Sequence, residues 1–135
     1  MASGQGNLTT YGANALLNAT VTIGGGTFYV ALFTADPTTA GDTTNELSGG
    51  GYARQPVTFP TASAGSVSNP SDITFAPWTG ATETETFIGL MDAATGGNMI
   101  ARVASSPSET LTSGANDEII IKAGTLTFSL VAYNG

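Results

Sequence analysis

The chain has 135 residues, 41% of them hydrophobic, and its ten acidic and three basic side chains give a net charge of -7. This length and apolar content indicate one domain with one core, and they exclude a disordered polymer. The three cations, Arg54, Arg102 and Lys122, are scattered along an acidic chain, so neither nucleic acid nor an anionic membrane is expected as a partner.

The N-terminal region predicts a short helix over residues 8–18. Its apolar side chains recur at helical spacing: Leu8, Tyr11, Ala15, Leu16 and Ala19. Asn7 or Thr9 is placed to cap the helix, since either side chain can accept a hydrogen bond from a free backbone N–H. The opening residues, MASGQGNLTT, have neither the basic nor the apolar region of a secretory signal, so we expect the chain to be made and folded in a cytoplasm.

The next element predicted is a strand over residues 27–34, TFYVALFT, which is apolar on both alternating faces. Such a strand belongs in the centre of a sheet. Its strongly apolar part, residues 28–33, is far too short to span a bilayer. Residues 35–51, ADPTTAGDTTNELSGGG, are rich in turn formers and predict a surface loop. Structureless loops beyond about 12 to 15 residues are usually functional or mobile, so this loop is a candidate contact arm.

Six further strands are predicted, at residues 55–59, 71–75, 85–91, 98–103, 118–122 and 126–131. Residues 93–97, Ala-Ala-Thr-Gly-Gly, connect the third of these to the fourth, and Ala123-Gly124 is expected to join the last two in a hairpin. Many short strands with one early helix predict an all-β fold, mainly an antiparallel β-sandwich or jelly roll. No repeat or linker divides the chain, so residues 1–135 are expected to form a single domain.

Catalysis is not expected. The chain has no histidine and no cysteine, which removes the Ser-His-Asp triad, thiol nucleophiles and every metal site that needs either residue. Paired carboxylates remain as an alternative, since Glu83 and Glu85 would share a strand face and Asp92 closes the next strand. Acidic residues at strand ends and turns are nevertheless typical of a solvated surface, and Trp78 is the only tryptophan available to line a sugar-binding cleft.

No cofactor is expected either. Four aspartates in loop-like sequence could offer oxygen ligands to calcium: Asp36, Asp42, Asp92 and Asp117. They lack the regular spacing of a calcium loop, and an aspartate at a turn commonly bonds its own backbone. The glycine run at residues 49–51 lacks the lysine and following helix of a phosphate-binding loop, so it is interpreted as a flexible segment that allows close backbone approach.

Five residues are candidates for contact with a protein partner: Asp36, Glu46, Tyr52, Arg54 and Trp78. Tyr52 and Arg54 lie on the same side of an extended segment after the loop, and both residue types are enriched in interface hot spots. The alternative is that Tyr52 packs on the rim of the core while Arg54 pairs with Asp36 or Glu46. Trp78 has the same two interpretations, as a contact anchor or as part of the core.

Residues 29–59 resemble a family of small bacteriophage virion proteins labelled tail fibre or head decoration proteins. Three elements carry the resemblance: the strand ending ALFT followed by Asp36-Pro37, the segment GGGYARQ at residues 49–55, and the stretch GLMDAATGGN at residues 89–98. The early helix and the last glycine-containing hairpin also fit, so the resemblance covers nearly the whole chain. It implies a component of the virus particle, and it implies a homotrimer, because decoration proteins are commonly trimers at local three-fold axes.

The leading hypothesis is a decoration, or cement, protein on the capsid exterior, with the major capsid protein as its partner. Only 10% of the residues are charged, so the exterior must be largely neutral and easily covered by another subunit. A fibre subunit usually shows repeats or a shaft, and neither is visible here. The alternative is a tail fibre or tail-associated component with a host-surface or glycan-binding role.

Overall fold

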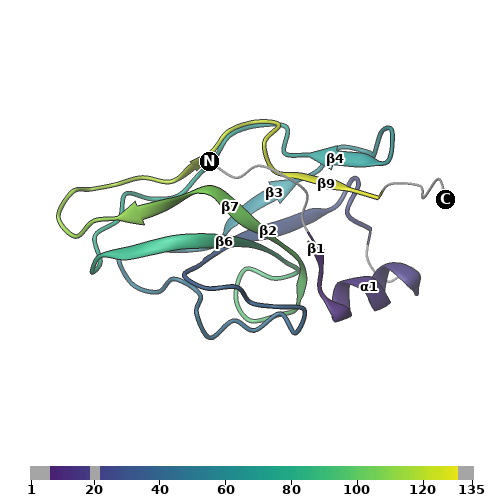
Figure 1. Cartoon of the computed structure of the whole chain (residues 1–135). Helices are drawn as coiled ribbons and strands as arrows, with labels where there is room; N and C mark the ends of the chain where they lie inside the picture. The colour runs from purple at the N-terminus through teal and green to yellow at the C-terminus, as the bar shows by residue number, and fades with distance from the viewer. Residues whose placement is uncertain (1–6, 19–21, 131–135) are drawn as a thin grey trace.

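The computed structural model describes residues 7–18 and 22–130, and this part of the chain forms one short helix and nine strands (Figure 1). In chain order the elements are β1 (Asn7–Leu8), α1 (Thr10–Leu17), β2 (Thr27–Phe33), β3 (Gln55–Thr58), β4 (Ser66–Ser68), β5 (Ile73–Thr74), β6 (Glu83–Met91), β7 (Met99–Leu111), β8 (Ile120–Ile121) and β9 (Thr127–Ser129). The expected all-β class with one early helix is confirmed. No helix in the described ranges is long and apolar enough to cross a membrane.

Five strands form an antiparallel sheet in the order β1-β7-β6-β2-β3. As its sequence predicts, β2 lies inside this sheet, where β3 and β6 pair with its two edges. The remaining strands make two ribbons, β4 with β9 and β5 with β8. The ribbons supply Val67, Phe128, Ile73 and Ile121 to the same core as Val30 on β2, so they pack on one face of the large sheet as a sandwich.

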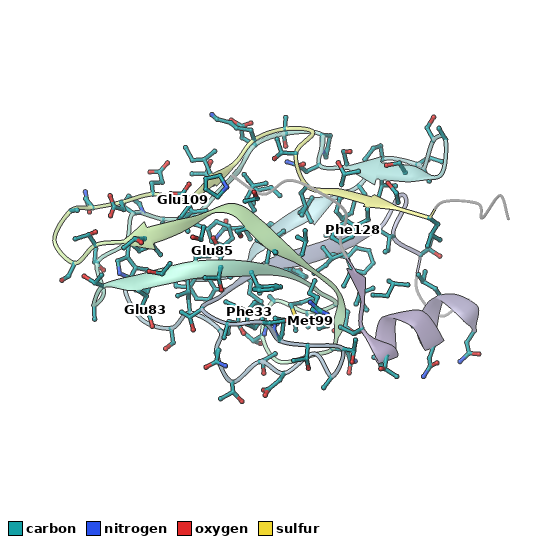
Figure 2. The ribbon with its side chains drawn as sticks, in the orientation of Figure 1. Phe33, Glu83, Glu85, Met99, Glu109 and Phe128 are labelled. Atoms are coloured by element: carbon teal, nitrogen blue, oxygen red, sulfur yellow. The ribbon has the colours of Figure 1, made fainter. Side chains whose placement is uncertain are left out.

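The other face of the large sheet is covered by loops. Phe33, Met91 and Met99 are buried there in a second, smaller core (Figure 2 labels the first and last). Gly41, within the long loop that precedes β3, approaches so closely that a Cβ would be 3.1 Å from the Cβ of Met99, and its φ of +68° is one that glycine adopts readily. Residues 35–51 are thus confirmed as a surface loop, but part of this loop is held against the sheet.

Helix α1, Thr10–Leu17, lies inside the predicted range of residues 8–18 but begins two residues later than predicted. Thr9 is its N-cap, and its hydroxyl accepts a hydrogen bond of 3.0 Å from the N–H of Gly12. The helix lies directly on β7, because a Cβ on Gly12 would be only 1.9 Å from the carbonyl oxygen of Ile100. Of the apolar residues that predicted the helix, Leu8 belongs to β1 and Ala19 lies outside the described residues.

Strand β7 is much longer than the predicted residues 98–103, because it continues to Leu111. The sequence Ser-Ser-Pro-Ser at residues 105–108 resembles a turn. Here it forms a bulge instead, since the register with β6 jumps from Ala104 to Glu109 on β7 while β6 advances only from Phe87 to Glu85.

The predicted hairpin at Ala123-Gly124 is wrong. A turn is present, with the N–H of Thr125 donating to the carbonyl of Lys122, but β8 pairs with β5 and β9 pairs with β4. The turn therefore passes the chain from one ribbon to the other. Strand β4 was not predicted, because Ser66–Ser68 carries a single buried side chain, Val67. Strands β5 and β8 are shorter than predicted, at two residues each.

Candidate interaction surfaces

Glu46, Tyr52 and Arg54 form a hydrogen-bonded group on the rim of the main core, called the Glu46 cluster below. The Arg54 guanidinium binds Glu46 in a bidentate manner, with Nε to Oε1 and Nη2 to Oε2 both at 2.8 Å. The Tyr52 hydroxyl donates to Glu46 Oε1 at 2.9 Å. Both charged side chains are largely buried, with 6% of Arg54 and 16% of Glu46 exposed.

The same cluster holds three segments of backbone together. The Tyr52 hydroxyl accepts a hydrogen bond of 3.0 Å from the N–H of Leu32 on β2. Leu32 lies two residues beyond Val30, where the pairing of β2 with β3 ends. Arg54 Nη1 donates to the carbonyl oxygens of Ala93 and Gly96 in the turn between β6 and β7. Hydrogen bonding to Glu46 raises the pKa of Arg54, and burial raises the pKa of Tyr52. The geometry corresponds to the intramolecular alternative for Tyr52 and Arg54, with Glu46 as the partner.

Trp78 also lies inside the domain. It is 4% exposed, belongs to the main core, and donates from Nε1 to the carbonyl of Ala81 at 2.8 Å. Gly50 and Gly80 lie against its ring, where a Cβ on either would approach to 3.0 Å or less. The glycine run at 49–51 therefore allows a close backbone approach, as the sequence predicts. Gly50 packs against the Trp78 ring and against the backbone of Gly80.

Asp36 is the most accessible charged residue among the five contact candidates. It pairs with Arg102 at 2.9 Å, and 43% of its side chain remains exposed. The Arg102 guanidinium lies over the ring of Phe87, 5.9 Å from its centroid, which is within the range of a cation–π contact. The pair fixes the start of the long loop to β7, so the loop is anchored at Asp36 as well as at Glu46.

All three cations of the chain are paired with carboxylates: Arg54 with Glu46, Arg102 with Asp36 and Lys122 with Asp72. Each positive charge is thereby neutralised locally. A phosphate backbone needs free Lys and Arg side chains that can displace its counterions.

Three glutamates lie on β6 and the far half of β7, in the region where these two strands pair (Figure 2). Glu85 lies opposite Glu109, and Glu83 lies opposite Leu111. Glu83 and Glu85 are two residues apart on β6 and share a face of the strand, as the sequence predicts. Glu85 is completely buried, and its Oε2 has no hydrogen-bond partner in the described part of the chain. Burial raises the pKa of Glu85 to about 7, against the lowering effect of a hydrogen bond from Ser105, and the nearby charge of Glu109 adds to the rise.

The structure does not bring Asp92 to this group. Asp92 lies seven positions after Glu85 along extended chain, which corresponds to about 23 Å. Carboxyl pairs that hydrolyse glycosides stand only about 5 to 9.5 Å apart. The catalytic alternative that combined Asp92 with the two glutamates therefore lacks the necessary geometry.

The four loop aspartates each accept a hydrogen bond from a backbone N–H: Asp36 from Thr38, Asp42 from Thr44, Asp92 from Asn98 and Asp117 from Thr112. This is the turn chemistry that the sequence offered as the alternative to calcium. Hydrogen bonds from Thr44 lower the pKa of Asp42. Within the described residues, no three acidic side chains are close enough together to hold a metal ion.

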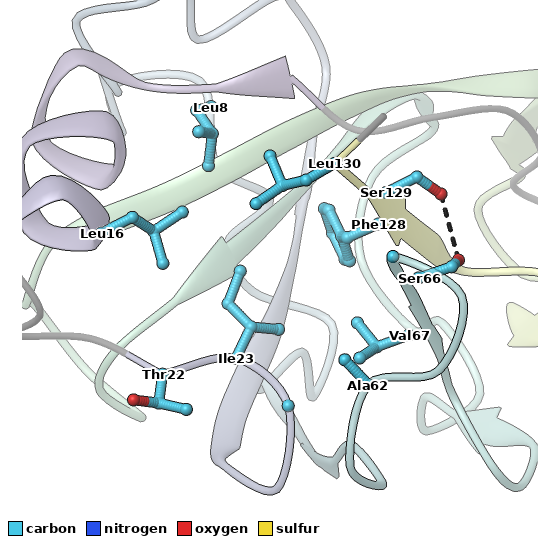
Figure 3. A pocket seen from close by; sticks show the side chains of 12 residues that line it. Leu8, Leu16, Thr22, Ile23, Ala62, Ser66, Val67, Phe128, Ser129 and Leu130 are labelled. Carbon is cyan, nitrogen blue, oxygen red and sulfur yellow. Dashed lines mark hydrogen bonds between the residues drawn. The ribbon is translucent and has the colours of Figure 1, made fainter. Parts of the chain in front are cut away.

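An open apolar pocket of about 250 Å³ lies between α1 and the β4–β9 ribbon (Figure 3). Its main lining side chains are Leu8, Leu16, Ile23, Ala62, Phe128 and Leu130. Leu130 is 70% exposed. The sequence did not reveal this pocket, because its walls come from four separate segments. The available signal was the alternation of Leu126, Phe128 and Leu130, which puts an apolar side chain beyond the end of the last strand.

The fold and these surfaces define a β-rich protein whose polar clusters hold its own loops in place. Residues 7–129 match the family model described as Podophage GP4 fiber I protein gp80. Because the match covers almost the whole chain, the chain belongs to this family of phage virion fibre proteins. A search of curated proteins gives no match. The resemblance to small bacteriophage virion proteins is thus confirmed, and the chain is a fibre-type virion protein.

Proposed function

We propose that this domain is a tail-associated fibre component that acts by binding neighbouring virion subunits and not by catalysis. The observation that carries the proposal is the family match over residues 7–129, since the matching model is described as a fibre protein. The described fold is a single sandwich with no shaft, so the domain would be a globular module of the fibre.

The internal hydrogen bonding supports a structural role. The Glu46 cluster and the Asp36–Arg102 pair fix the long loop to the sheet, so the loop can present a constant surface to a neighbour. A loop that is already ordered loses little conformational entropy on binding. The exposed part of this loop is rich in threonine, for example Thr39, Thr43 and Thr44, which costs less to desolvate than a charged surface.

A second candidate is the capsid decoration protein expected from the sequence. The observation in its favour is the compact single sandwich, which needs no repeat or shaft and could sit as a separate unit on a shell. In this case the partner would be the major capsid protein. The stabilising mechanism would be linkage, because a ligand that binds only the expanded shell lowers the free energy of that shell.

Copy number in purified particles tests the two candidates directly. Quantitative gel electrophoresis against the major capsid protein should give tens of copies or fewer per particle for a tail-associated fibre, whereas a decoration protein should be present in hundreds, an expectation from symmetry. Antibody labelling seen by electron microscopy should place the chain on the tail. Hundreds of copies with label on the head would overturn the fibre proposal, and absence from the particle would overturn both candidates.

Heat stability provides an independent measurement. Particles that lack the chain should release DNA at the same temperature as complete particles if the chain is a tail fibre. A lower release temperature, restored when purified protein is added back, would instead support the decoration candidate.

A further inference from the structure

We propose that Glu85 and Glu109 form an acid pair that holds one proton between β6 and β7, and that loss of this proton opens the strand ends that carry the pair. These strand ends, residues 83–85 of β6 and 109–111 of β7, are called the far arm below. The inference goes beyond the proposed function, since it assigns a proton-binding site and a local movement that do not depend on where the chain lies in the virion.

The far arm is a two-stranded extension of the large sheet. Strand β2 pairs with β6 only as far as Phe33 opposite Phe87, so among the described strands residues 83–85 pair with β7 alone. A bulge separates this pairing from the rest of β7, because the register jumps from Ala104 to Glu109. A pair of strands outside a larger sheet is marginally stable. The far arm is therefore a unit that can open while the rest of the sheet stays paired.

Glu85 is buried in the far arm without a partner for its charge. None of the residue is exposed, Ser105 donates a hydrogen bond to Oε1, and Oε2 has no hydrogen-bond partner among the described residues. Glu109 lies directly opposite (Figure 2), a position at which two Cβ atoms are about 4.5 to 5.5 Å apart. Two carboxylates this close disfavour ionisation of both. A proton on Oε2 of Glu85 removes the buried charge and leaves the pair with a single negative charge.

The described side chains around the pair supply no positive charge. Glu83, which also has a buried oxygen without a partner, and Asp117, which accepts a hydrogen bond from the backbone just beyond the far arm, are both acidic. The three Lys and Arg side chains pair with other carboxylates. Burial raises the pKa of Glu85 to about 7 and the charge of Glu109 adds to the rise, against the hydrogen bond from Ser105 and the positive N-terminal amino group. Since no three acidic side chains of the described residues can hold a metal ion, a proton is the cation that fits this pair.

Loss of the proton favours the open far arm. When the arm opens, Glu85 reaches water and its pKa returns to the ordinary value of 4.5, so the open form binds the proton less tightly than the closed form. The closed form therefore has its full advantage below pH 4.5 and loses it as the pH rises through 7. These two pKa values predict that the ratio of open to closed arms rises about tenfold between pH 6 and pH 8. Opening exposes Leu111, a residue of the main core.

Amide hydrogen exchange of the full chain tests the proposal, measured by NMR at pH 6 and pH 8 and divided by the intrinsic rate at each pH. Amides of the far arm should exchange about tenfold faster at pH 8, at a rate that low concentrations of urea barely change. Tyr29 and Val30 pair on both edges of β2, so their amides should be more protected. Urea should accelerate exchange at these two residues, because global unfolding exposes much more surface than local opening.

Three substitutions separate the acid pair from other acidic groups. Glu85→Gln keeps the shape of the side chain without its charge, so exchange in the far arm should no longer depend on pH. Glu109→Gln should reduce the dependence, because one negative charge no longer faces Glu85. Glu118→Gln is the matched control, since Glu118 is exposed and lies outside the far arm. Circular dichroism checks that each variant retains the fold.

NMR titration of the carboxyl carbons gives a readout that does not require opening. The pair should lose its two protons in separate steps, with one step near pH 7. In Glu109→Gln the step of Glu85 should move to lower pH, because the facing negative charge is gone. A carboxyl group raised by burial alone would titrate at the same pH in this variant.

Three results would overturn the proposal. Independent titration of Glu85 and Glu109 would mean that they share no proton. Exchange in the far arm at the same urea-dependent rate as at Tyr29 and Val30 would mean that deprotonation acts on the whole fold. Calcium chloride that restores, at pH 8, the protection seen at pH 6 would mean that the site binds a metal ion in place of a proton.

Discussion

Glu46 and Glu85 are both acidic side chains withdrawn from solvent, but their surroundings differ. Glu46 receives two hydrogen bonds from Arg54 and one from Tyr52, so both of its oxygens are bound. Glu85 receives one hydrogen bond from Ser105, faces a second carboxylate, Glu109, and keeps one oxygen unpaired in the described structure. The cost of burying a charge depends on its partners, so the first site should hold the fold together while the second should make stability depend on pH.

Removing the cation from the Glu46 cluster should have the largest effect. Arg54→Ala leaves Glu46 largely buried without its bidentate partner, and it also removes the hydrogen bonds to the turn between β6 and β7. We expect a loss of about 3 kcal/mol in the free energy of unfolding, measured by urea denaturation. Arg54→Lys should recover only part of this, because an ammonium group cannot make the planar bidentate contact. A loss below about 1 kcal/mol for Arg54→Ala would show that Glu46 is solvated in solution.

Replacing the unsatisfied carboxylate should have the opposite sign. The pKa of Glu85 rises from 4.5 to about 7 on folding, so the folded state binds its proton more tightly than the unfolded state. Stability is therefore greatest below pH 4.5 as far as this group is concerned, and it falls by about 3 kcal/mol as pH rises to 7 and above. Glu85→Gln should raise the free energy of unfolding by about 2 kcal/mol at pH 8 and change it little at pH 4.5.

Urea denaturation of both proteins between pH 4.5 and pH 8 measures this difference. Glu118→Gln is the matched control, since Glu118 is exposed and the same substitution there should leave the pH profile unchanged. A Glu85→Gln variant with the same pH dependence as the wild type would mean that Glu85 does not titrate in this range.

Removing the Tyr52 hydroxyl from the Glu46 cluster should have a smaller effect than removing the Arg54 cation. Tyr52→Phe keeps the ring, which stacks on Phe75, but leaves the N–H of Leu32 without its acceptor. We expect a loss of about 1 to 2 kcal/mol in the free energy of unfolding. Amide hydrogen exchange should show faster exchange at Leu32 than in the wild type. Unchanged exchange at Leu32 would indicate that another group takes the place of the hydroxyl.

The difference between local pattern and long-range pairing explains how much of the fold the sequence could predict. Strand β2 was predicted correctly because its apolar residues on both faces permit only a central position. Strand β7 was cut short because Ser105 to Ser108 resembles a turn, and only pairing with β6 makes it a bulge. The hairpin at Ala123-Gly124 failed for a related reason. A turn-forming dipeptide specifies a change of direction, but long-range pairing decides which strands lie side by side.

The sequence identified the contact candidates by residue type, but it could not predict which residues pair with one another. The sequence offered Asp36 and Glu46 as partners for Arg54, and spacing alone could not choose between them. The choice depends on tertiary packing, because the loop brings Glu46 back to β2 while Asp36 meets Arg102 on β7. The burial of Glu85 was invisible for the same reason, since its strand pattern is equally consistent with a solvated edge.

Breaking the exposed Lys122–Asp72 ion pair should have the smallest effect on the free energy of unfolding. Its N–O distance of 3.2 Å is not much longer than that of Arg54 and Glu46, but 62% of the lysine side chain and 46% of the aspartate are exposed. Water therefore solvates both charges when the pair is broken. Lys122→Ala should cost less than about 1 kcal/mol in urea denaturation, and less still at high salt. Asp72 keeps its hydrogen bond from the N–H of Ala123 in that variant. A loss of stability as large as that of Arg54→Ala would therefore show that the difference in burial does not explain the different contributions of the two ion pairs.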